Sequence, residues 1–511
     1  MTTESTTEIE RTFDVDLATV LPALVGIDGV ARVGQAVELS LEAVYFDTAD
    51  FDLARRGVTL RRRTGGADAG WHMKLPDVGD ARTELRSPLG RATRSVPDAL
   101  LEPVRAVVRD RPLVPVARIA TRRLESELLD DAGGVLARVC DDHVRGEQLH
   151  VGAEVREWRE WEVELASGDD VLLGLVEEAW RDAGAQRGQA SSKLARTLTG
   201  LVVPASSPMR EEELRRATAG GALTDVLGRQ LDQLLERDRL LRAGEAGSVH
   251  KMRIAARRLG SALKTYGPLL DDAAGAESLA AELRWLGQAL GPARDAQVLR
   301  QRLYCLVAAQ PPDLVLGPVA GLIDDDLKAV ERDAREETMA ALGSARYFRL
   351  LDHLDDIVRS PSFTAEGEEP ARRVFARLLV RDARRLRRAV KGVQCAEDGE
   401  HRDLALHEAR KKAKRLRYAA ESMSPVLGKQ ADDLAVSVER IQQSLGEFQD
   451  TVMSRRVLRD YGARAHVQGQ NGFTYGRLHH LEEVHAEAAV RDFEDAWSQL
   501  SLKGLRRRLE A

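Results

Sequence analysis

The second half of the chain contains the same pattern twice, and this repeat constrains the fold more than any other feature. One copy begins at His250 and reads HKMRIAARRL, and the other begins at His407 and reads HEARKKAKRL. Each is followed by a second matching element, LGPARD from Leu290 and LGEFQD from Leu445. Because the repeat extends over more than one helix, it predicts two related helical units.

Both copies place basic residues on one face of a predicted helix and apolar residues on the other. The basic residues of the two faces are His250, Arg253, Arg257 and Lys264 in the first copy, and His407, Arg410, Lys414 and Arg417 in the second. Like charges at this spacing repel by a few tenths of a kcal/mol per pair, so an anion would relieve them. Two such faces predict a shared basic groove for phosphate groups. For each histidine taken alone, a local helix-start role is the competing interpretation.

From Glu8 to about Leu201 the chain alternates polar and apolar residues over short runs, which is typical of β-strands. The alternating positions carry charged residues at Glu8, Glu10, Arg61, Arg63, Lys74, Glu162 and Glu164. In a flat sheet this face would lie in solvent, whereas in a closed barrel it would line a polar tunnel. The alternation alone leaves both arrangements open.

The domain boundary is predicted at the segment LVVPASSPM, whose proline and serine content is typical of a linker. The expected domains are 4–201, a linker at 202–210, and an all-helical domain at 211–509. The helical domain follows from the apolar spacing of three and four after Glu211. Together they predict an α+β chain with a β domain first and helical bundles second.

The composition excludes several classes of protein. The 511 residues contain no uncharged apolar stretch long enough to span a membrane, and the start, MTTESTTEIERTF, is unlike a secretory signal. We therefore expect a cytoplasmic protein, with association with polyphosphate granules as an open option. Cys140, Cys305 and Cys395 lack the spacing of a disulfide framework or a zinc site. The net charge is −6, but residues 371–391 carry nine Arg or Lys against one Asp. Such a block is most often a solvated helix face.

The repeated H-x-x-R-x-x-x-[RK]-R-L element resembles the CHAD family, the conserved-histidine α-helical domain, over roughly residues 215–505. The resemblance implies two pseudo-symmetric helical bundles with a basic central surface that binds inorganic polyphosphate. The ligands it implies are His250, Arg253, Arg257, Arg258, Lys264, His407, Arg410, Lys411, Lys414, Arg415 and Arg417.

The first 200 residues resemble a CYTH domain of the triphosphate tunnel metalloenzyme family. The resemblance is carried by EIER from Glu8, YFDT, LRRR, HMKLP, EVE from Glu162, and Ser192-Lys193. It implies an eight-stranded antiparallel barrel that holds a triphosphate. It implies Mg²⁺ or Mn²⁺ on Glu8, Glu10, Glu162 and Glu164, and phosphates on Arg61, Arg63, Lys74 and Lys193. Weaker implied candidates are Arg82, Glu84, Arg123, Arg138 and Asp141.

The chain departs from the CYTH pattern at Thr12, where the family's Glu-x-Glu-x-Lys motif has its lysine. Arg11 cannot substitute, because adjacent strand residues face opposite sides. Two functions therefore remain open. The first is a polyphosphate-binding protein with a metal-dependent inorganic triphosphatase in its tunnel. The second is a non-catalytic polyphosphate-binding or scaffolding protein with a degenerate tunnel.

Other ligands are ranked lower. Organic triphosphates follow inorganic polyphosphate and tripolyphosphate, because no nucleobase pocket can be read from the sequence. Nucleic acid is disfavoured, since the 4% aromatic content argues against base stacking. Binding to a duplex backbone stays open, and the sequence does not predict the oligomeric state.

Overall fold

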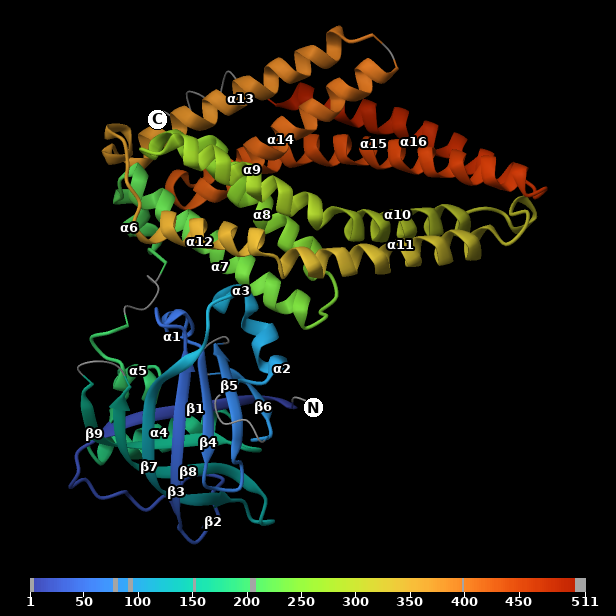
Figure 1. Ribbon diagram of the computed structural model, residues 1–511. Helices are drawn as coiled ribbons and strands as arrows, with labels where there is room; N and C mark the ends of the chain where they lie inside the picture. The colour runs from blue at the N-terminus through green and yellow to red at the C-terminus, as the bar shows by residue number, and fades with distance from the viewer. Residues whose placement is uncertain are drawn as a thin grey trace. The chain divides into compact units, whose positions relative to one another are not determined.

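The computed structural model describes residues 4–76, 81–90, 95–149, 153–202, 208–397 and 399–500. The chain divides into two compact units, Met1–Ser206 and Ser207–Ala511. Part of the predicted linker, 203–207, and the end of the predicted helical domain, 501–509, lie outside the described residues. Figure 1 shows strands in the first unit and long helices in the second, and the predicted α+β class is confirmed.

Antiparallel strands of the first unit close into a barrel (Figure 1). The strands are β1 (Glu4–Val15), β2 (Arg32–Val33), β3 (Val37–Asp47), β4 (Thr59–Thr64), β5 (Gly70–Pro76), β6 (Ala81–Ser87), β7 (Val114–Leu129), β8 (Val135–Gln148), β9 (Val155–Leu165) and β10 (Gln186–Arg187). The order around the barrel is β1-β6-β5-β4-β3-β7-β8-β9, and pairing of β9 with β1 closes it. Among the described residues eight strands form the wall, while β2 and β10 only extend it.

Strand β1 closes the barrel because its two halves pair with different neighbours. Its first half, through Ile9, pairs with β6, and its second half, from Glu10, pairs with β9. The alternation of side chains then sends Glu8, Glu10 and Thr12 inward. The apolar alternates, such as Phe13, pack outward against a core that includes Trp161 and Trp180.

The first unit also contains helices that the alternation of the sequence did not predict. They are α1 (Asp52–Arg55), α2 (Asp98–Leu101), α3 (Arg105–Val108), α4 (Asp170–Asp182) and α5 (Lys193–Thr197), with a 3-10 turn at Glu102–Val104. Helix α4 starts at Asp169, whose side chain accepts hydrogen bonds from the backbone N–H of Val171 and Leu172 at 3.1 Å. Its apolar face contacts the core around Trp161. Helix α5 starts at Ser192, which caps it in the same way.

The second unit is helical throughout its regular structure. Its helices are α6 (Glu211–Arg216), α7 (Ala219–Arg242), α8 (Ser248–Tyr266), α9 (Ala273–Ala289), α10 (Gly291–Ala308), α11 (Val319–Leu342), α12 (Ala345–Arg359), α13 (Ala371–Cys395), α14 (Glu400–Leu427), α15 (Lys429–Val467) and α16 (Phe473–Gln499). Short 3-10 turns lie at Gly267–Leu269, Pro312–Leu314 and Ala365–Glu368. In the described residues, no helix combines the length and apolar character needed to cross a membrane.

The sequence repeat corresponds to two related groups of helices. His250 lies on α8 and His407 on α14, and each of these helices is preceded by a long helix, α7 or α13. The starts of α7 and α13 pair with one another, since Ala219 N–H donates to Glu369 O at 2.8 Å and Ala371 N–H donates to Ala217 O at 3.1 Å. The two groups therefore meet through equivalent segments.

The two copies differ at one proline. The first copy has Pro292 within the LGPARD element, and there the chain is broken into α9 and α10. The second copy has Glu447 at the matching place, and α15 runs without interruption through 39 residues. The position of the break fits Pro292, which has no backbone N–H and lies in the first turn of α10, where proline is favoured.

Candidate functional site

The barrel encloses a cavity of about 560 Å³. The predicted triphosphate and metal residues all line this cavity; they are Glu8, Glu10, Arg61, Arg63, Lys74, Glu162, Glu164 and Lys193. The charged alternates therefore face a tunnel and not solvent. Of the weaker candidates, Arg82, Glu84, Arg123 and Arg138 also line it. Asp141 does not share their position, because its carboxylate accepts hydrogen bonds from Arg159 at 2.7 and 2.8 Å.

Charges of opposite sign are interleaved on the side of the tunnel formed by β1, β5 and β6. Lys74 Nζ lies 2.7 Å from Glu8 Oε2 and 3.2 Å from Glu10 Oε2. Arg86 Nη2 lies 2.9 Å from Glu8 Oε1, and Arg82 Nε lies 3.8 Å from Glu10 Oε1. Glu8 is 7% exposed, so its charge depends on these partners and not on water.

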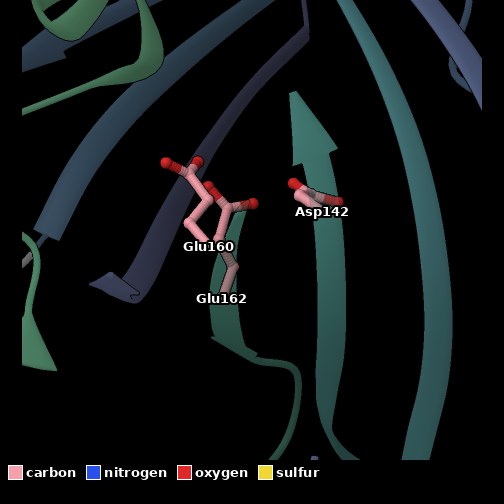
Figure 2. A group of neighbouring side chains, drawn as sticks. All are labelled: Asp142, Glu160 and Glu162. Carbon is pink, nitrogen blue, oxygen red and sulfur yellow. The ribbon is translucent and has the colours of Figure 1, made fainter. Parts of the chain in front are cut away.

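A second group of carboxylates forms on β8 and β9. Figure 2 shows Glu160 and Glu162 of β9 beside Asp142 of β8, and carboxylate oxygens of the three lie within 4.8 Å of one another. Lys193 Nζ, delivered by α5, lies 3.0 Å from Asp142 and 2.7 Å from Glu160, and also pairs with Glu162. Asp142 and Glu160 were not predicted from the sequence, although Asp142 adjoins Asp141 and Glu160 lies two residues before Glu162 on β9.

The pKa values of tunnel groups reflect this crowding. Burial alone would lower the pKa of Lys193, but the charges of Glu160 and Glu162 outweigh it and raise that pKa well above its usual value. Burial, followed by the positive charge of Arg61, lowers the pKa of Arg63 to about 9. Burial and the negative charge of Glu8 raise the pKa of Glu164.

The carboxylates suit a hard divalent cation, which prefers oxygen ligands. Glu10 and Glu164 are directly opposite one another on β1 and β9, and Glu8 lies on the same face of β1. Burial is the largest cause of the raised pKa of Glu164, the charge of Glu8 adds to it, and a divalent cation would offset both. At Asp142, Glu160 and Glu162 a metal would compete with Lys193, just as at Glu8 and Glu10 it would compete with Lys74.

Arg196 is a further cation of the tunnel that was not predicted from the sequence. Arg196, on α5, lines the tunnel and forms an ion pair with Asp14, which follows Thr12 on the inner face of β1. Arg11 points outward, as expected, and pairs with Glu177 of α4 at 2.7 Å. The tunnel therefore contains an arginine near the place where the CYTH pattern has a lysine.

A basic groove of about 870 Å³ lies in the helical unit. Eight of the residues implied as polyphosphate ligands line it; they are Arg253, Arg257, Lys264, His407, Arg410, Lys411, Lys414 and Arg415. Arg284 of α9 and Lys412 of α14 also line it, and the sequence analysis missed both. Arg284 lies outside the repeated motif, so the repeat gave no signal for it.

The second element of each repeat holds an arginine of the first element. Arg253 Nη1 donates to Gly291 O at 3.2 Å and lies 2.8 Å from Asp295 Oδ1. In the second copy, Arg410 lies against Gly446, where an added Cβ would be 3.4 Å from Nη2. The guanidinium therefore packs closely against the backbone of α15 at this glycine.

The groove concentrates positive charge. Burial, followed by the charges of Arg410, Arg257 and Arg253, lowers the pKa of Lys414 to about 6. The two arginines of the first copy and Arg410 of the second therefore surround Lys414 together. An anion placed there would restore the charged form of the lysine.

Three of the implied ligands lie elsewhere. His250 is exposed at the start of α8. Its counterpart in the second copy, His407, does line the groove, and its Nδ1 lies 2.8 Å from Gln449 Oε1. Arg258 and Arg417 both pair with Glu421, at 3.0 and 2.6 Å. The Arg258 contact joins α8 to α14 across the repeat, whereas the Arg417 contact spans one turn within α14.

Comparisons with known proteins agree with this division. Residues 7–198 match the CYTH domain family, and residues 225–459 match the CHAD domain family. The chain is 40% identical over 517 aligned residues to "Uncharacterized protein Rv2226" of Mycobacterium tuberculosis (strain ATCC 25618 / H37Rv), with 96% of each chain covered. "Uncharacterized protein MT2285" of strain CDC 1551 / Oshkosh matches equally.

Solved structures resemble parts of the chain. PptA from Streptomyces chartreusis has 22% identity and a TM-score of 0.47, covering 55% of this chain and 100% of its own. The CHAD domain from the plant Ricinus communis has 21% identity and a TM-score of 0.38, covering 60% of this chain and 97% of its own.

Proposed function

Because the chain belongs to the family of proteins that join a CYTH domain to a CHAD domain, we propose that it binds inorganic polyphosphate and hydrolyses short inorganic polyphosphates such as tripolyphosphate. The tunnel supplies the hydrolytic site and the basic groove supplies the binding site. A divalent cation, Mg²⁺ or Mn²⁺, serves the tunnel. Such an ion neutralises phosphate charge and activates water when it is bound.

The observation that carries this proposal is the interleaving of cations and carboxylates in one closed cavity. Arg61, Arg63, Lys74 and Lys193 suit phosphate oxygens, and Glu8, Glu10 and Glu164 suit a metal. A purely basic tunnel would bind phosphate without a place for the metal. A purely acidic one would repel the substrate.

Orthophosphate release from tripolyphosphate tests the catalytic part. We expect metal-dependent release by the purified chain, and a loss of at least about tenfold for Glu10→Gln, because a metal contact is removed. Glu157→Gln is the matched control, since that side chain lies on β9 but is 72% exposed. Release without added metal, or unchanged release by Glu10→Gln, would contradict the assignment.

The non-catalytic alternative is favoured by Thr12. If folded protein releases no phosphate but still binds tripolyphosphate, the tunnel is a binding site built on the barrel of an enzyme. The groove is tested separately with Arg257→Gln/Lys414→Gln, which should weaken long-chain polyphosphate binding by about tenfold or more, as expected for losing charge-assisted contacts. Duplex DNA should compete poorly at physiological salt.

A further inference from the structure

Helix α13 carries a basic face that the proposed groove does not include. The residues of this α13 basic face are all exposed; they are Arg373, Arg377, Arg384, Arg388 and Lys391. Their spacing places them along one side of the helix, over about 27 Å at 1.5 Å per residue. The opposite side is apolar and buried, with Phe375 and Leu386 fully covered.

The repeat itself indicates that this face is not required for packing. The equivalent helix of the first copy, α7, carries four basic and four acidic residues. Helix α13 carries nine basic residues and one acidic residue, Asp382, which is buried. Two helices with equivalent places in the fold therefore differ strongly in charge, and packing alone does not explain the excess.

The basic face is continuous with the groove. Arg415, which lines the groove, donates to Lys264 O at 2.5 Å and to Thr265 Oγ1 at 3.1 Å. Arg381 of α13 donates to Thr265 O at 3.0 Å, so both arginines hold the same end of α8. Burial lowers the pKa of Arg415, and the charges of Arg385 and Arg381 contribute. The groove and α13 thus share one positive field.

The charge continues outward from this junction. Burial, Arg385 and Arg377 all lower the pKa of Arg381, so its neighbours toward the basic face are close enough to repel it. The acid at the junction is Asp382, which lies 2.9 Å from Arg415 and 2.6 Å from Arg385. Asp382, together with Glu366, which pairs with Arg377, balances only part of this charge. A polyanion crossing the junction would meet cations on both sides.

We propose that the α13 basic face extends the groove, so that a phosphate polymer too long for the groove continues along α13. This inference rests on the proposed polyphosphate binding by the groove. It assigns long inorganic polyphosphate to α13 as its ligand. The protein would then bind long polyphosphates more tightly than short ones. A regularly charged flexible polymer can follow a straight cationic helix without needing base or side-chain readout.

A membrane surface fits this face less well. Amphipathic helices bind membranes by inserting their apolar side. The apolar side of α13 is already packed in the helical unit, with Val374, Leu379 and Val390 buried. Nucleic acid shares the phosphate chemistry and is tested as a competitor.

The test compares three variants of the full chain over polyphosphates of increasing length. The α13 variant is Arg384→Gln/Arg388→Gln/Lys391→Gln, and the groove variant is Arg257→Gln/Lys414→Gln. The matched control is Arg456→Gln/Arg459→Gln/Arg491→Gln, which removes three exposed cations from α15 and α16. Affinity is measured by calorimetry at several salt concentrations, and circular dichroism confirms folding.

We expect the α13 variant to match the unmodified chain for short polyphosphates and to bind long ones about tenfold more weakly. Its salt dependence should flatten by about 2, at roughly 0.7 per lost contact as for flexible single strands. If it instead behaves like the control at every length, the extension is wrong. Equal competition by duplex DNA would make α13 a nucleic-acid surface. If the groove variant keeps full affinity for long chains, the failure lies in the proposed groove.

Discussion

At the scale of single residues, we predict that Arg196 and Thr12 affect how tightly the tunnel binds a phosphate chain. Arg196 lies on the tunnel side of α5 and pairs with Asp14. We predict that Arg196→Gln raises KM for tripolyphosphate by about tenfold, as loss of one charge-assisted contact implies. Thr12→Lys in the same chain should restore much of the affinity, because it returns a cation from β1.

Steady-state kinetics of orthophosphate release checks this pair. Arg145→Gln is the control, since Arg145 lies on the outside of β8 with 55% exposure. The double variant is the informative protein. If Thr12→Lys rescues nothing, Arg196 is positioned for Asp14 and the helix, not for substrate.

We predict that Lys414 makes polyphosphate binding depend on pH. Its pKa is lowered from 10.5 to about 6, so in the free protein it loses its proton as pH rises through 6. A bound phosphate chain raises that pKa, and binding then takes up a proton. Affinity should be highest below about pH 6 and fall as pH rises toward 8.

Lys414→Arg isolates this effect, because arginine stays charged over the whole range. We expect a flatter pH profile and tighter binding at pH 8 than in the unmodified chain. Titration of the polymer's own end groups is common to both proteins and cancels in the comparison. Calorimetry in two buffers measures the proton uptake, and identical profiles would count against a titrating Lys414.

At the scale of elements, α5 is held in place by a glycine on β8. A Cβ at Gly146 would overlap Thr197 Oγ1, and Gln148 Nε2 donates to Thr197 O at 2.8 Å. We predict that Gly146→Ala shifts α5, slows phosphate release several-fold, and destabilises the first unit by about 1–3 kcal/mol. Lys193 would move with the helix.

The second variant, Gly146→Ala/Thr197→Ala, removes the overlapping atoms and should recover part of the loss. Gly174→Ala on α4 is the control, because nothing lies within 4 Å of the added Cβ. It should be neutral or stabilising by about 0.5–1 kcal/mol. Release rates and thermal unfolding together check the prediction, and an active, stable Gly146→Ala protein would contradict it.

The sequence predicted elements better than it predicted their contacts. Period-two alternation identified the inner face of β1 and β9, but not the helices α4 and α5. The CYTH resemblance implied Asp141, which is bound by Arg159, and did not imply its neighbour Asp142, which contacts Lys193. The repeat identified Arg253 and Arg410, which share a local environment built by the repeat itself.

Arg258 and Arg417 show why the rest could not be predicted. Both have the right residue type on the right helix, yet Glu421 pairs with each of them. For Arg258 the contact depends on how α8 crosses α14, which periodicity within one helix does not contain. The Arg417–Glu421 pair is one turn apart on α14, so helical spacing alone allows it. Arg284 could not be predicted either, because it lies on α9, outside the repeated motif, and lines the groove only through the packing of the helices.

At the scale of the whole molecule, two compact units should unfold separately. We predict two thermal transitions. Long-chain polyphosphate at a hundredfold excess over its Kd should increase the free energy of unfolding of the helical unit by about 2.7 kcal/mol, which raises the temperature of its transition. Arg257→Gln/Lys414→Gln should abolish that shift and keep tripolyphosphate hydrolysis. Differential scanning calorimetry separates the transitions, and a single transition that shifts as one would show that the units are coupled.

The ion pairs of the tunnel also affect how phosphate and a divalent cation would bind there. Phosphate entering alone would draw Lys74 away from Glu8 and Lys193 away from Glu162. Among the described residues, each buried carboxylate would then keep only its arginine partner, Arg86 for Glu8 and Arg123 for Glu162. A divalent cation entering alone would strand the lysines in the same way. Together the two satisfy every group, so each strengthens the binding of the other by the same factor. If the proposed function is right, the barrel binds phosphate weakly wherever free divalent cations are scarce.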